Sequence, residues 1–367
     1  MIEYLVLFGI CSISYPLMRI LPLKHKIRKA ICISIPLLVF LIMMTLRSFS
    51  VGADIKTYYE IFVRYQNGTD SPGKKDVLFY YLLLLFSKIP GVLGFRLFLF
   101  CEYLFLVVGC FLLLYYYSEN IHVNLVILLM CPLFPLLVSG LRQTLGIAFC
   151  LISMFFVKRI TNKYIKWSLS LIAWALSCFC HISSVFFVIY YVILSFNKFK
   201  KINILILVGI WLFACIFTRY MFPVINSFYN FGYGSGGAFN GLPKISILYF
   251  LLILVAALFF NKENIKLPLL GEFNFPDKYR ELFKESFSMS FVFCLVYTSA
   301  CWNNVTPRLG IFFVIGFPTV ASVIIRGFKK PTTRFSLNLL VIVLSIVGFI
   351  YENMITNACG TYPFLWF

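Results

Sequence analysis

The sequence predicts an all-α, polytopic membrane protein, and three observations support that fold class. The 367 residues are 61% hydrophobic and only 12% charged, about half the charged share of an average soluble domain. Their mean hydropathy is +0.93. Apolar runs long enough to cross a bilayer recur from one end of the chain to the other. We therefore expect lipid to be the solvent for most of the chain.

Basic residues give the chain a net charge of +19 and indicate its topology. They fall in short clusters between apolar runs, which argues against nucleic-acid binding, because that needs a basic face on an exposed domain. By the positive-inside tendency the clusters mark cytoplasmic segments. These are residues 19–29, 158–166, 198–201, 262–284 and 326–334. The twelve cysteines lie mostly inside apolar runs, where buried thiols are expected rather than a disulfide framework.

The spacing of the clusters predicts about twelve membrane spans in a single transmembrane domain, residues 1–367, with both termini outside. Two cytoplasmic clusters must be separated by an even number of crossings. The long apolar run between Lys166 and Lys198 is therefore expected to form two short helices that turn near His181. The predicted spans are 3–19, 30–46, 95–117, 121–139, 143–157, 167–180, 183–196, 202–219, 245–260, 286–302, 309–325 and 336–352.

Several connecting segments have their own character. Residues 77–86 would reach only about 15 Å as a helix, half the hydrocarbon core, so a re-entrant or interfacial helix is expected near 77–89. Residues 47–75 form a polar outer loop, and 220–244 form a glycine-rich outer loop that lacks the spacing of a phosphate-binding loop. Residues 262–285 form a cytoplasmic loop.

Ionisable residues at the outer helix ends are the candidates for chemistry, because charge near hydrocarbon is costly unless it faces a cavity, a partner or a ligand. Arg142 and Gln143 open a helix, where a guanidinium beside backbone amides suits phosphate. An interface anchor is the plainer alternative for Arg142. The Cys-x-Cys-His sequence ending at His181 supplies too few spaced ligands for zinc, and no metal or cofactor is predicted. The full set is Arg47, Asp54, Arg142, His181, Arg219 and Arg308.

These motifs together resemble the EpsG/Wzy-type polysaccharide polymerase family. An Arg-x4-Gly-x-Asp-x3-Tyr-x3-Phe string is matched by Arg47, Gly52, Asp54, Tyr58 and Phe62. The resemblance covers the chain from about residue 40 onward. It departs from the family at Asp76, where Glu is more usual, and in the glycine-rich loop, which has no counterpart there. The other matches are Asp76 with Phe79, Arg142-Gln143 with Ala148, His181 to Ser184, Arg308, and Tyr362-Pro363-Phe364.

The resemblance implies a GT-C-like membrane glycosyltransferase that joins undecaprenyl-diphosphate-linked oligosaccharides outside the bacterial cytoplasmic membrane, for O-antigen, capsule or exopolysaccharide. It also implies membrane lipids, a chain-length regulator and a flippase as partners. Permanently charged arginines suit a diphosphate, and a general base must accept the proton of the acceptor hydroxyl. The candidates are Arg47, Arg142, Arg308 and Gln143 for the diphosphate, His181 or Asp54 for the base, and Tyr58, Asp76, Arg219 and Tyr233 for the sugars.

Two other functions remain open at this point. A flippase for the same lipids would need two related halves and charges along a central path. The sequence shows no internal repeat and few charged residues in the middle of the predicted helices. Glu102 is one of those few. A membrane acyltransferase or a glycan ligase would also use His and Arg at the outer face. The string from Arg47 to Phe62 favours the polymerase.

Overall fold

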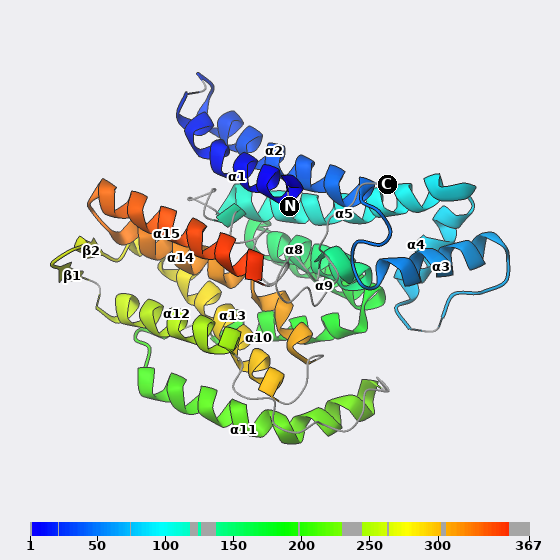
Figure 1. Cartoon of the computed structure of the whole chain (residues 1–367). Coiled ribbons are helices and arrows are strands. Elements are labelled where there is room, and N and C mark those ends of the chain that lie inside the picture. Colours follow the sequence, from blue (N-terminus) through cyan, green and yellow to red (C-terminus); the bar gives the residue numbers. More distant parts are fainter. Residues whose placement is uncertain are drawn as a thin grey trace. The chain divides into compact units, whose positions relative to one another are not determined.

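In the computed structural model the chain is almost entirely helical (Figure 1). The structure describes residues 2–20, 22–73, 75–117, 124–125, 137–196, 199–229, 244–262, 264–301 and 306–351. The chain divides into two compact units. Unit 1 comprises Met1–Val185 and Leu340–Phe367, and unit 2 comprises Phe186–Leu339.

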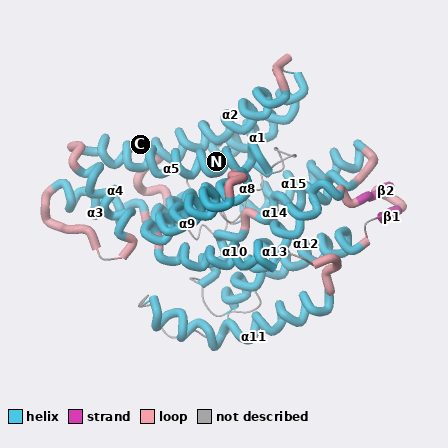
Figure 2. Tube along the Cα trace, turned by 180° about the vertical axis from the view of Figure 1, so that it is seen from behind, coloured by secondary structure: helices cyan, strands magenta, loops and turns pink. Residues whose placement is uncertain are grey.

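Unit 1 is a set of packed helices in which α2 lies against α5, α5 against α8, and α8 against α9 (Figures 1 and 2). Small polar side chains seal the last of these contacts: Ser153 and Ser170 are hydrogen-bonded at 2.8 Å, and the Ser177 hydroxyl donates to the Gly146 carbonyl at 2.7 Å. Small residues of this kind let helices approach closely where lipid provides no hydrophobic driving force. The helices of unit 1 are α1 (Ile2–Ile20), α2 (His25–Leu46), α3 (Ile55–Gln66), α4 (Val77–Ser87), α5 (Gly91–Tyr117), α8 (Leu141–Arg159) and α9 (Lys163–Cys180).

An aromatic cluster joins the two short helices of unit 1, α3 and α4, to α5. Phe62, Phe79 and Phe95 are completely buried. The Phe62 and Phe95 ring centroids lie 5.4 Å apart, and those of Phe79 and Phe98 lie 5.5 Å apart, both edge to face. A side chain at Gly94 would come within 2.7 Å of the Phe86 carbonyl, so only glycine fits where α5 approaches α4. This cluster fixes the start of α4, which carries Asp76.

Unit 2 holds the remaining helices and one small sheet. Its helices α12, α13 and α14 pack together, and a side chain at Gly316 would come within 2.6 Å of the Ser290 hydroxyl. The 3-10 helix Ile182–Phe187 crosses from unit 1 into unit 2, and α15 crosses back at residues 339–340. The elements are α10 (Val188–Phe196), α11 (Ile204–Tyr229), α12 (Lys244–Asn261), β1 (Asn264–Leu267), β2 (Gly271–Asn274), α13 (Arg280–Tyr297), α14 (Gly316–Gly327) and α15 (Pro331–Ile350), with 3-10 turns at Asp277–Tyr279, Thr298–Cys301 and Thr306–Phe313.

The helical, membrane-type fold agrees with the predicted class. Every predicted span coincides with a helical segment except 121–139, most of which lies outside the described residues. By length and composition, four described helices can cross a membrane: His25–Leu46, Gly91–Tyr116, Leu141–Arg159 and Pro331–Ile350. Others are apolar but shorter, such as Ile204–Tyr220 and Ser246–Asn261. The count of about twelve spans and the GT-C-like architecture stay predictions.

Three connecting segments differ from their expected form. The segment 47–75, predicted as an outer loop, contains α3, an amphipathic helix that buries Ile55, Tyr58, Phe62 and Tyr65 at helical spacing. The segment 262–285, predicted as a cytoplasmic loop, contains a small β-hairpin and the first turns of α13. In the segment 220–244, predicted as a glycine-rich outer loop, α11 continues to Tyr229 and α12 begins at Lys244, and residues 230–243 lie outside the described part. The helix predicted near 77–89 is α4, of eleven residues, and its re-entrant or interfacial position stays a prediction.

Gly52 provides a test of how unit 1 is packed. Its φ is +100°, and a side chain there would meet the Val138 carbonyl at 2.9 Å. Gly52→Ala is expected to lose about 1–2 kcal/mol through the backbone conformation and about 1–3 kcal/mol more through overlap with the 138–139 backbone. Gly68→Ala is the matched control, since Gly68 has φ +68° and open space around it. Thermal unfolding in detergent should show the larger loss at Gly52; equal losses would contradict this packing.

Candidate functional site

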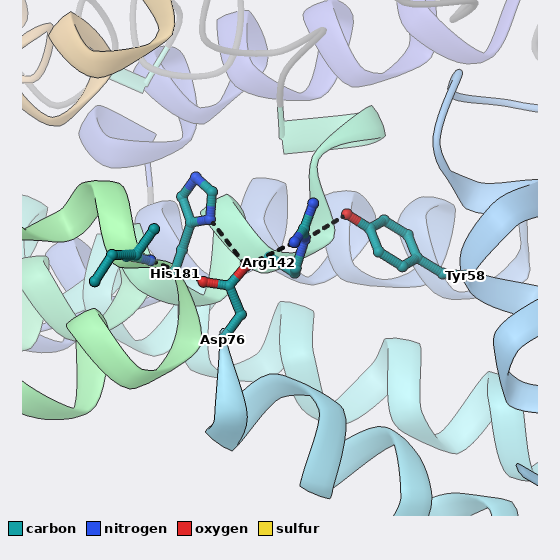
Figure 3. A network of polar contacts seen from close by, with 5 residues as sticks. Tyr58, Asp76, Arg142 and His181 are labelled. Atoms are coloured by element: carbon teal, nitrogen blue, oxygen red, sulfur yellow. Dashed lines mark hydrogen bonds and ion pairs between the residues drawn. The ribbon is translucent and has the colours of Figure 1, made fainter. Parts of the chain in front are cut away.

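A buried carboxylate at the start of α4 brings an arginine and a histidine together (Figure 3). Asp76 Oδ2 accepts a hydrogen bond from Arg142 Nη1 at 2.6 Å and lies 3.7 Å from His181 Nδ1. Its other oxygen, Oδ1, accepts from the backbone N–H of Ile182 at 2.9 Å. The Asp76 side chain is only 4% exposed, whereas that of Arg142 is 34% exposed. The cation therefore reaches solvent while its counterion does not.

Asp76 is held in an unusual conformation. It is the only non-glycine residue with positive φ (+52°) in the described part of the chain, a left-handed geometry that costs a residue with a side chain about 1–2 kcal/mol. It also occupies the N-cap position of α4 without making the usual capping bond. The carboxylate is instead directed at Arg142 and at the turn containing His181. Asp76 therefore contributes to the polar cluster instead of capping its own helix.

The electrostatics keep the Asp76 carboxylate ionised. Burial alone raises the pKa of Asp76, but His181, the charge of Arg142 and the Ile182 N–H together outweigh burial, so the pKa lies below its ordinary value. Asp76 is therefore the fixed negative charge of the cluster.

Arg142 occupies the first turn of α8 and is fixed on two sides. Its Nε donates to the Tyr58 hydroxyl at 3.0 Å, and its Nη1 is bound to Asp76. The rings of Tyr58 and Tyr80 lie 5.8 and 5.9 Å from the guanidinium carbon. Burial raises the pKa of Tyr58 despite the opposing charge of Arg142, so its hydroxyl stays neutral. Within the described residues Nη2 makes no hydrogen bond, which leaves it available to an anion.

His181 stands where α9 ends. Its backbone is extended (φ −154°, ψ 115°), and its N–H donates to the Ser177 carbonyl at 2.9 Å, so the helix breaks at the residue where the sequence predicts a turn. Nδ1 is buried and faces Asp76, while the other ring nitrogen points away from the carboxylate (Figure 3). Gly146, one turn after Arg142, makes this approach possible, since a side chain there would meet the Ser184 hydroxyl at 2.7 Å.

Arg47 lies outside this cluster. It is completely buried, and its Nη2 donates to the Tyr103 hydroxyl at 2.9 Å. Tyr103 in turn donates to the Leu137 carbonyl at 2.7 Å. Arg47 therefore ties the end of α2 to α5 and to the segment that leads into Arg142. Its neighbour Glu102 is also buried, with neither carboxyl oxygen hydrogen-bonded among the described residues.

Within the described part of the chain, the other predicted residues make no hydrogen bond or ion pair with Asp76, Arg142 or His181. Asp54 begins α3, and its backbone N–H donates to the Ser139 hydroxyl at 3.3 Å, but its carboxylate makes no capping bond. Gln143 is buried beside Arg142 in α8. Arg219 and Arg308 are exposed in unit 2 and Tyr233 lies outside the described residues, so the convergence of these three on the Asp76 cluster stays a prediction.

Sequence reasoning missed two members of the site. Tyr80 follows Asp76 by four residues, which puts both on one face of α4, and that spacing could have identified it. No residue pattern could have predicted the contact of the Ile182 N–H, because every residue except proline has such a donor and only the folded chain shows where it points. Asp76 was predicted as a sugar contact, and the structure makes it the centre of the cluster.

The fold and the site together define a polytopic, helical membrane protein with a charged cluster at its helix ends. The EpsG family model matches residues 30–366, and the chain belongs to the EpsG family, a family of Wzy-type polymerases. This confirms the resemblance seen in the motifs and supports a general role in the polymerisation of surface polysaccharide. Neither a curated protein nor a solved structure matches the chain.

The lowered pKa of Asp76 predicts a pH dependence of stability. A carboxyl whose folded-state pKa is depressed stabilises the fold above its unfolded pKa, about 3.9, and this contribution disappears as the pH falls through the folded pKa. Asp76→Asn should cost about 1–3 kcal/mol at neutral pH and should flatten the loss of stability below about pH 4.

Unfolding midpoints from neutral pH down to about pH 3 would measure this effect, bracketing the unfolded pKa. Asp70→Asn is the matched control, because the pKa of Asp70 is also lowered, by its hydrogen bond with Arg64, but in solvent. An exposed pair of that kind contributes little. Identical acid profiles for wild type and Asp76→Asn would rule out Asp76 as the stabilising carboxylate.

Proposed function

We propose that this chain polymerises undecaprenyl-diphosphate-linked oligosaccharide repeat units by glycosyl transfer at the outer face of the bacterial cytoplasmic membrane. The observation that carries the proposal is the buried carboxylate of Asp76, which holds the guanidinium of Arg142 beside the imidazole of His181. Membership of the EpsG family supports the class of reaction. The charge of Arg142 suits the departing diphosphate, and the imidazole of His181 suits transfer of the acceptor's proton.

Arg142 is the residue best suited to the lipid diphosphate. Two of its nitrogens are fixed by Asp76 and Tyr58, so the guanidinium is oriented before substrate arrives, and Nη2 is left to bind a phosphate oxygen. A permanently charged, pre-oriented donor stabilises negative charge as the leaving group develops it. Arg308 and Gln143 remain candidates for further phosphate contacts. Arg47 acts through the segment that precedes Arg142, since its own side chain is buried against Tyr103.

His181 is the general base in this proposal. The acceptor hydroxyl gives its proton to Nε2 and attacks the anomeric carbon of the donor sugar. The bond from that carbon to the diphosphate oxygen breaks, and the diphosphate leaves with the electron pair. The Asp76 carboxylate faces Nδ1, where it orients the ring and stabilises the imidazolium. The 3.7 Å separation is a substrate-free distance that substrate binding would shorten. Asp54 is less suited, because within the described residues no hydrogen bond or ion pair joins its carboxylate to Asp76, Arg142 or His181.

Tyr80 is the sugar contact that the geometry favours. Its ring lies beside the guanidinium, and within the described residues its hydroxyl has no hydrogen bond. A sugar attached to a phosphate on Arg142 would therefore meet an aromatic face and a free hydroxyl. Tyr58 is buried and bonded to Arg142, so it orients the arginine rather than the sugar.

Arg142→Ala and His181→Ala are expected to abolish long glycan chains while the protein still inserts and accumulates, because loss of a general base alone slows a reaction by about 10²–10⁴-fold. Glycan ladders from a deletion strain complemented with each variant give the measurement. Arg64→Ala is the control, since Arg64 forms only an exposed pair with Asp70. Retained chain length in either variant would exclude that residue. Purified protein that moves lipid-linked units across vesicles without lengthening them would identify a transporter instead.

Tyr80→Leu should raise KM for the lipid-linked repeat unit more than it lowers kcat, because it removes binding that donor and transition state share. Tyr80→Phe keeps the ring and separates stacking from hydrogen bonding. Tyr81→Leu is the matched control, since Tyr81 is the next residue and is 57% exposed. Chain extension by protein in nanodiscs is the assay. Equal kinetics for Tyr80→Leu and Tyr81→Leu would show that Tyr80 does not contact the sugar.

A further inference from the structure

The β-hairpin of unit 2 is a structured element within a segment expected to be a loop. Strands β1 and β2 lie side by side (Figure 2). They pair antiparallel, with Ile265 opposite Phe273 and Lys266 opposite Glu272. Residues 268–270 form the turn, and Gly271 closes it with φ +83°. The foot of the hairpin, at Glu272 and Phe273, differs in character from its tip, the turn that contains Leu269.

The foot of the hairpin is fixed to the helices of unit 2. Phe273 is completely buried, with its ring centroid 4.7 Å from that of Phe259 and 5.2 Å from that of Phe328. Its ring packs directly on Gly327, where a side chain would collide with it. The Lys329 N–H donates to the Glu272 carbonyl at 2.9 Å, which adds a backbone bond to the contact. The orientation of the tip is therefore set by the core.

The tip presents a leucine to its surroundings beside a membrane helix. Leu269 is 92% exposed, the highest exposure among the large hydrophobic residues of the described chain. The Thr333 hydroxyl, in the first turn of α15, donates to the carbonyl of the next residue, Leu270, at 2.8 Å. Helix α15 is a candidate membrane span with Phe335 62% exposed two residues later. The tip is thus bonded to the first turn of a candidate span, at the level where a headgroup region would begin.

Positive charge surrounds the tip. Glu272 binds Lys329 at 2.8 Å and lies 3.8 Å from Lys266. One negative charge is therefore shared between two lysines. Lys330 is exposed and has no acidic partner within the described residues. The segment is one of the basic clusters that mark the cytoplasmic side, where the leaflet carries anionic lipid. Arg334, in the first turns of α15, adds a further cation.

We propose that this hairpin is a membrane-surface anchor, with Leu269 inserted among the headgroups of anionic lipids and Lys330 bound to their phosphates. An apolar tip flanked by cations is the pattern of an interfacial anchor. A single leucine is too small for a stable protein interface, which buries about 1,200–2,000 Å². The proposal is independent of the glycosyl-transfer chemistry.

A polarity-sensitive fluorophore on Leu269→Cys tests the proposal in the full chain reconstituted into nanodiscs. One set of discs contains phosphatidylglycerol and the other only phosphatidylcholine. Asn67→Cys, exposed in the turn after α3, is the water-exposed reference. The parent protein, labelled in parallel, gives the background from its native cysteines.

The label at residue 269 should emit at shorter wavelength than the reference, resist iodide in the water and be quenched by lipids that carry a spin label near the headgroup. The blue shift should be larger in phosphatidylglycerol, and Lys330→Gln should reduce that difference. Emission and iodide quenching equal to those of the reference would overturn the anchor. An equal shift in both lipids would overturn the role of Lys330 and of anionic headgroups.

Discussion

The ion pair between Asp76 and Arg142 is the constraint on which the arrangement of the site depends. One buried carboxylate receives a guanidinium, an imidazole and a backbone N–H from three separate elements. Without the carboxylate, Arg142 and the Ile182 N–H would have no common acceptor, and a cation near hydrocarbon would lack its counterion. The left-handed backbone of Asp76 fits this view, because a strained conformation persists only where the surrounding structure imposes it.

Close helix contacts bring the partners to that carboxylate. Gly146 and Ser177 let α9 approach α8, which places His181 beside the helix that carries Arg142. Gly52 admits the backbone that precedes α8, and Arg47 holds the same backbone through Tyr103. The motif that begins at Arg47 therefore positions the backbone that leads into Arg142. Its tyrosine, Tyr58, contacts the guanidinium itself.

The sequence predicts the helices well, since apolar length and basic clusters are properties of the chain alone, and the helix break at His181 follows from them. The centre of the site could not be predicted in the same way. Asp76 and Arg142 are separated by 66 residues, and nothing local shows that the carboxylate leaves its capping position for that contact. The hairpin was missed because strands of four residues give too short an alternation to stand out in a charged segment.

The central claim is that Asp76 organises one site in which Arg142 binds the diphosphate and His181 receives the proton. An experimental structure of the chain in a lipid nanodisc with undecaprenyl diphosphate bound tests it most directly. The account predicts a phosphate oxygen within hydrogen-bond distance of Arg142 Nη2, and the Asp76 to His181 contact shortened to a hydrogen bond. A diphosphate held elsewhere, with the Asp76 cluster unchanged and closed to it, would contradict the account.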